Sequence, residues 1–257
     1  MTARRAAAFC SLAAVLLTAA CTSYYEIPIE TPIRPKLDVG AFQRVLIAGF
    51  LAGGSEDIDG NLETTRLLRS QLRTKSEMRV IDTDVLPLME VATEGRADAD
   101  AAAGAGAPAP LPPPIKEEKD LENYEHIFAN TEYWKRIGEE YQQPLIVTGT
   151  VMFTPMQRNQ VVQRDQEVYD SFGRRRVQPV RQFVERKGFA LEGRFIFIDG
   201  RTGATLHSET FGEQILYAAN NATPALSSYF ELMDKLIPSF LSTLSSQKIK
   251  GTRILLQ

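Results

Sequence analysis

The chain has 257 residues, of which 44% are hydrophobic and 24% are charged, and its formal net charge is -3. This composition excludes a disordered polymer, a protein that crosses a membrane many times and a small disulfide-stabilised scaffold. The slight excess of acidic residues gives no whole-chain attraction for nucleic acid, so we expect no nucleic-acid partner. Two His and two Cys leave few of the side chains that commonly do catalysis or hold a metal.

The first twenty residues are typical of a bacterial export signal. Two arginines precede a short apolar stretch, residues 6–18, which is too short to span a bilayer comfortably. The segment Leu17–Cys21 (LTAAC) resembles a lipobox, although Thr18 stands where Leu is commoner. We predict a lipoprotein signal peptide over residues 1–20 and lipidation of Cys21, with palmitate among the acyl chains that it carries. The alternative is a plain signal peptide that leaves Cys21 unmodified.

Acylation of Cys21 would also decide where the protein sits. Cys10 leaves with the signal peptide, so the mature chain would hold no thiol for catalysis or for a metal site. Thr22 follows the Cys, and by resemblance to enteric lipoproteins the lack of Asp there favours transfer to the outer membrane. We therefore predict a lipid-anchored protein on the periplasmic face of the outer membrane, with the membrane as its partner through the anchor.

The Pro-punctuated residues 21–40 are predicted to form an extended, lipidated tether, with an edge strand packed on the body as the alternative. Residues 41–257 are predicted to form a single α/β (or α+β) domain with a mixed central sheet flanked by helices. Periodicity predicts strands over 44–50, 78–82, 144–153, 189–199, 204–211 and 253–257, and helices over 60–75, from 83 or 84, over 120–140 and from 224. Asp59 or Asn61 could cap the helix over 60–75, and Asn130 or Thr131 could break or recap the helix over 120–140. Pro238 is expected to kink or divide the last helix.

Residues 94–118 differ from the rest of the chain because Ala, Gly and Pro dominate and large apolar residues are nearly absent. Such a stretch buries too little surface to offset its ordering entropy, so it is predicted to be a disordered insertion.

Several elements together resemble a family of periplasmic lipoproteins. They are the run Arg44–Phe50 followed by a helix, the strand Met78–Asp82, the strand Pro144–Thr150 ending in Thr-Gly-Thr, and the hairpin Phe195–Ala204 with its Asp-x-x-Thr-Gly turn. The pattern resembles the fold shared by the curli-secretion lipoprotein, the penicillin-binding-protein activator lipoproteins and the N-terminal domain of the Tol-system β-propeller protein. The resemblance implies a non-enzymatic interaction domain and carries over no catalytic residue.

The stretch 157–186 is polar and rich in charge. The curli lipoprotein makes a pore by inserting hairpins, which need alternating apolar and polar residues. Here charge falls on both faces in any register, so we expect no pore. The densest basic cluster is predicted to contact an anionic partner, such as lipid headgroups, lipopolysaccharide phosphate or an acidic protein, the alternative being a solvated hairpin tip. The cluster extends to Arg186 and Lys187, and its predicted contact residues are Arg174, Arg175, Arg176 and Arg181.

No motif indicates catalysis, a cofactor or a metal. His207, Ser208 and Glu209 are consecutive in a predicted strand, where alternating side chains cannot converge as a triad. We expect a non-catalytic interaction or scaffold module of the cell envelope, with an envelope protein as partner and self-association as one form of that contact. The alternatives are a periplasmic small-ligand carrier and an envelope hydrolase.

Overall fold

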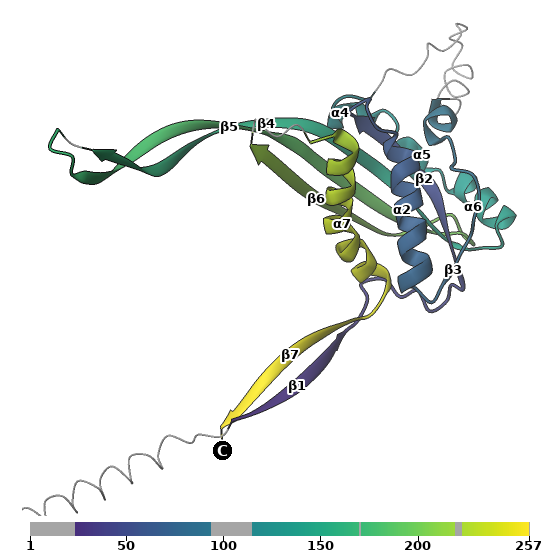
Figure 1. Ribbon diagram of the computed structural model, residues 1–257. Coiled ribbons are helices and arrows are strands. Elements are labelled where there is room, and N and C mark those ends of the chain that lie inside the picture. The colour runs from purple at the N-terminus through teal and green to yellow at the C-terminus, as the bar shows by residue number, and fades with distance from the viewer. Residues whose placement is uncertain (1–23, 94–114, 170, 219–222, 257) are drawn as a thin grey trace, which may run out of the picture. The chain divides into compact units, whose positions relative to one another are not determined.

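The computed structural model of the protein describes residues 24–93, 115–169, 171–218 and 223–256 (Figure 1). The chain divides into two compact units, residues 1–35 with 246–257 and residues 36–245. The predicted signal peptide, Cys21 and residues 94–114 of the predicted insertion lie outside the described residues.

The smaller unit contains a two-stranded antiparallel sheet of β1 (Tyr24–Ile33) and β7 (Gln247–Leu256). The pairing runs from Tyr24 opposite Leu256 to Ile33 opposite Gln247. Proline is tolerated in β1 because each strand of a two-stranded sheet has an open edge that needs no ladder donor. Residues 24–33 are therefore extended, as the sequence predicted, and they form a strand paired with residues 247–256. Residues 247–256 belong to this sheet and not to the main sheet.

The larger unit is built on a five-stranded mixed sheet with the strand order β3-β2-β4-β5-β6. β2 runs parallel to both β3 and β4, whereas β5 runs antiparallel to β4 and β6. The strands span Arg44–Gly54 (β2), Arg79–Val80 (β3), Leu145–Tyr169 (β4), Arg175–Asp199 (β5) and Thr205–Ala218 (β6).

Helices cover both faces of this sheet, which confirms the predicted α/β layering (Figure 1). One face packs against α2 (Gly60–Lys75) and α7 (Ala225–Leu244). The other packs against α4 (Glu118–Glu122), α5 (His126–Ala129) and α6 (Thr131–Glu140). Alternation along the strands assigns side chains to the two layers: Phe195 and Phe197 enter the first, whereas Ile196 and Ile198 enter the second.

Helix ends follow local capping chemistry. Asp59 caps α2 by accepting a hydrogen bond from the Leu62 N–H at 3.0 Å. Asn130 accepts one from the Tyr133 N–H at 3.0 Å and starts α6, so the helix predicted over 120–140 is broken at Asn130 as expected. It is also broken between Glu122 and His126, which the sequence did not predict. Pro238 was expected to kink or divide the last helix, and α7 is not divided, because it continues through Pro238. Buried neighbours on both sides, Leu236 and Phe240, hold that helix against the sheet and offset the missing hydrogen bond.

The predicted insertion ends earlier than residue 118. Ile115 is only 4% exposed and belongs to the core layer beneath α4 to α6. Its carbonyl oxygen accepts a hydrogen bond from the Gly54 N–H at 2.9 Å, and α4 already begins at Glu118. A single large apolar residue therefore anchors the end of a stretch that composition alone assigned to disorder.

A β-bulge interrupts the pairing of β2 with β4 between Ile47 and Gly49. Gly49 has a φ of 138°, which disfavours any residue with a Cβ. Backbone groups that lose ladder partners at a buried bulge must be satisfied elsewhere. Three contacts do so: Leu86 N–H to the Ala48 oxygen at 2.8 Å, Thr148 Oγ1 to the Gly49 oxygen at 2.9 Å, and Phe50 N–H to Asn61 Oδ1 at 2.7 Å.

We predict that Asn61→Ala destabilises the fold by about 1–3 kcal/mol, because it leaves the buried Phe50 N–H without its acceptor. Urea denaturation measures the change. Asn159→Ala, at an exposed strand position, serves as the control and should shift stability by less than about 0.5 kcal/mol. Equal effects of the two substitutions would contradict the assigned role of Asn61.

Candidate functional site

β4 and β5 continue together well past the rest of the sheet (Figure 1). The pairing of β4 with β2 ends at Phe153, and the pairing of β5 with β6 ends at Arg186 opposite Ala218. Beyond these points the described strands pair only with one another, as a two-stranded ribbon. We call residues 158–169 and 175–186 the arm.

The register of the arm assigns every side chain to one of two faces. Pairing runs without a shift from Leu145 opposite Asp199 to Tyr169 opposite Arg175, so odd residues oppose odd ones and even residues oppose even ones. Successive side chains of a strand point to opposite faces. The arm therefore has an odd face and an even face, and each continues one of the two faces of the main sheet.

The even face is basic and contains no acidic residue. It consists of four arginines, four glutamines and four valines: Arg158, Arg164, Arg176, Arg186, Gln160, Gln166, Gln178, Gln182, Val162, Val168, Val180 and Val184. Arg158 and Arg186 lie directly opposite each other. Charge on this face is thus of one sign along the whole arm.

The odd face is mixed in charge and exposes aromatic side chains. Arg175 forms an ion pair with Glu167 there, and Asp165, Glu185 and Arg181 share the face. Phe183 is 80% exposed and Tyr169 is 66% exposed. Large exposed apolar groups on a ribbon that buries no core are typical of a surface that meets another molecule.

The structure separates the four arginines that the sequence grouped together. Arg176 lies on the even face, whereas Arg175 and Arg181 lie on the odd face. Arg174 belongs to the connection between the strands, where its guanidinium stacks over the ring of Phe172 at 5.3 Å. The cluster predicted from local density is therefore divided among three environments.

Sequence reasoning missed the even face as a unit. Its members Arg158, Arg164 and Arg186 are spread over 28 residues of sequence, and only the strand register brings them to the same side as Arg176. The available signal was that all four residue numbers are even, on either side of a connection that contains Gly173.

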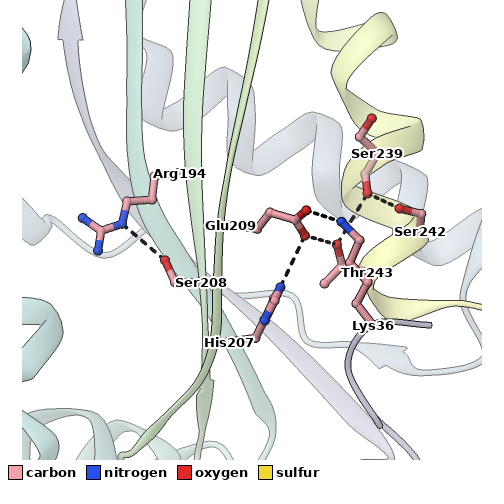
Figure 2. Close-up of polar contacts among 8 residues, drawn as sticks. All are labelled: Lys36, Arg194, His207, Ser208, Glu209, Ser239, Ser242 and Thr243. Atoms are coloured by element: carbon pink, nitrogen blue, oxygen red, sulfur yellow. Dashed lines mark hydrogen bonds and ion pairs between the residues drawn. The ribbon is translucent and has the colours of Figure 1, made fainter.

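Away from the arm, a cluster of polar side chains in the larger unit joins β6, α7 and residue 36 (Figure 2). Glu209 accepts hydrogen bonds from the Lys36 ammonium and from Thr243 Oγ1 at 3.2 Å, and His207 Nε2 lies 3.3 Å from its Oε2. Ser208 points the other way and lies 3.3 Å from Arg194 Nε. The hydroxyl and the imidazole are thus on opposite faces, as their adjacency in sequence predicted.

The electrostatics of Glu209 follow from these contacts. Partial burial raises the pKa of its carboxyl, but hydrogen bonds from Lys36 and His207, the Lys36 charge and the Thr243 hydroxyl together lower the pKa below its ordinary value. The carboxylate is therefore held ionised between β6, the end of α7 and residue 36, which is a structural role.

Two hollows open on the surface of the larger unit. The first, of about 480 Å³, lies between α4 and the sheet and includes Glu118, Glu122, Glu192 and Arg194 among its lining residues. The second, of about 540 Å³, lies beside β3. Charged side chains make up half or more of the lining residues of each hollow, unlike the apolar cavity of a lipid carrier.

The described part of the chain contains no group of three or more His, Cys, Asp or Glu side chains that could hold a metal ion.

No protein-family model and no curated protein matches the chain. Among solved structures the chain is similar to the lipoprotein GNA1162 from Neisseria meningitidis, with a TM-score of 0.33 and 11% sequence identity, over 77% of this chain and 97% of that one. A TM-score this low does not establish a shared fold. None of the helices in the described residues is long and apolar enough to cross a membrane.

We predict that Glu209→Gln lowers stability at neutral pH by about 1 kcal/mol and flattens its pH dependence. Because the folded-state pKa of Glu209 is lowered, its ionised form stabilises the fold above the ordinary value of 4.5, and this contribution is lost as the pH falls through the lowered value. Urea midpoints measured from neutral pH downward test the prediction. Glu213→Gln, on the same strand and face, is the matched control, and identical pH profiles for the two variants would contradict the prediction.

Proposed function

We propose that this chain is an outer-membrane-anchored periplasmic lipoprotein that acts as a non-catalytic interaction module of the cell envelope, using the β4–β5 arm to contact a protein partner. The observation that carries the interaction role is the arm itself. An isolated two-stranded ribbon is marginally stable in water, and this one exposes aromatic side chains along its odd face. Contact with a partner would bury those groups and stabilise the ribbon.

The odd face offers the chemistry of a protein interface. Phe183 and Val161 lie opposite each other and are 80% and 51% exposed. Residues of both charge signs surround them, which suits a rim that pairs with polar groups on a partner. Aromatic anchors within a polar rim are the usual source of binding energy in protein–protein contacts.

The anchor is proposed from the sequence. The lipobox-like Leu17–Cys21 follows a short apolar segment, and the acyl chains on one Cys would hold the protein at a bilayer. The proposal of a non-catalytic role is supported by the separation of His207 from Ser208 across the sheet. The charged linings of the two hollows weigh against a carrier for lipid.

We predict that Cys21→Ser yields unprocessed protein or protein released from the membrane fraction, because the thiol that accepts the lipid is gone. Fractionation of envelopes and mass spectrometry of the mature N-terminus measure both outcomes. An unacylated residue 21 in the native protein would remove the basis for the proposed location.

We predict that a photoreactive amino acid in place of Phe183 forms one dominant protein adduct in intact envelopes, whereas the same group at Glu132, exposed on α6, forms none. Phe183→Ser should reduce the equivalent adduct formed from position 169 while changing folding stability by less than about 0.5 kcal/mol, because the ring is mostly exposed. If positions 183 and 132 formed the same adducts, the hypothesis that the arm is the contact surface would be refuted.

A further inference from the structure

We infer that the even face of the arm binds the anionic headgroup surface of a lipid bilayer. The inference rests on the proposed function for the presence of a bilayer beside the chain. It assigns a second role to the arm, because the odd face is proposed to meet protein and the even face to meet lipid.

The first argument is the segregation of charge by face. The even face carries four arginines and no acidic residue, whereas the odd face carries three carboxylates with two arginines. A surface of one sign along one side of a ribbon is complementary to a surface of the opposite sign.

The second argument is the row in which Arg158 and Arg186 are directly opposed. Like charges at directly opposite strand positions destabilise a sheet. The next residue in that row is Ala218 of β6, which supplies no neutralising group. A phosphate placed over the row would accept hydrogen bonds from both guanidinium groups and turn the repulsion into a binding site.

The third argument favours a bilayer over a single small anion. At about 3.4 Å per residue, the arginines of the even face are distributed along roughly 34 Å of ribbon, from the row of Arg158 to the row of Arg176. One phosphate can occupy one row, whereas a layer of headgroups offers a phosphate to each row that faces it. Valines between the arginines add apolar atoms, and side chains of this mixed kind suit the boundary between headgroups and acyl chains.

The test uses the mature, acylated protein reconstituted into vesicles. Cys10 leaves with the signal peptide and Cys21 carries lipid under the proposed function, so an introduced Cys would be the single reactive thiol. Gln182→Cys places a fluorophore on the even face, and Gln163→Cys places it on the odd face as the matched control, since both positions are exposed. Quenching by aqueous acrylamide then reports how accessible each face is to solvent.

We expect quenching at position 182 to fall roughly threefold when vesicles of phosphatidylcholine are replaced by equal parts phosphatidylcholine and phosphatidylglycerol. The protection should disappear in high salt, where the Debye length falls to about 3 Å. Position 163 should be quenched equally in both vesicles. Replacing Arg158, Arg164 and Arg186 together by Gln should abolish the protection, whereas replacing Arg175 and Arg181 by Gln should preserve it.

Equal quenching at position 182 in the two kinds of vesicle would overturn the inference. The inference would also be overturned if soluble polyphosphate, added to neutral vesicles, protected position 182 from quenching while phosphatidylglycerol did not. That result would assign the even face to a soluble anionic polymer. Flotation separates this result from a failure of the proposed function. Protein that does not float with neutral vesicles lacks the anchor, whereas the label at position 182 still reports whether the even face binds phosphatidylglycerol.

Discussion

The uninterrupted pairing of β4 with β5 is the constraint on which the rest of the larger unit depends. Pairing runs without a shift from Leu145 opposite Asp199 to Tyr169 opposite Arg175, so one parity applies along both strands. A slip of one residue would move every side chain to the other face. Within the helix-covered part of the sheet, such a slip would move side chains from one core layer to the other. In the arm, it would place acidic residues of the odd face among the arginines of the even face.

The same two strands therefore do two different jobs. Near the body their side chains are buried under helices on both faces, and residues such as Phe195 and Ile198 are fully inaccessible. Past Phe153 and Arg186 the neighbouring strands end, so the ribbon presents both faces to its surroundings. The buried part supplies the core contacts of the sheet, and the arm contributes little to that core because its side chains are mostly exposed.

Local sequence patterns do not reveal contacts with distant segments. The Pro-containing residues 24–33 were expected to be an extended tether, and they pair with a strand 214 residues or more further along the chain, at 247–256. Pro238 was expected to kink or divide the last helix, and α7 stays undivided because the helix is buried on both sides of Pro238. Ile115 ends the predicted insertion early because a single apolar side chain can be buried by a long-range contact. In each case a tertiary contact outweighs a local preference.

The amino-acid sequence by itself determined the α/β class, the exact span of α2, the division of the helix at Asn130 and the inability of His207 and Ser208 to converge. These follow from periodicity and capping, which act over a few neighbouring residues. Only the tertiary structure decided which arginines share a surface. Arg158 and Arg186 are 28 residues apart, and they become neighbours because hydrogen bonding between strands fixes a register that local density of charge does not reveal.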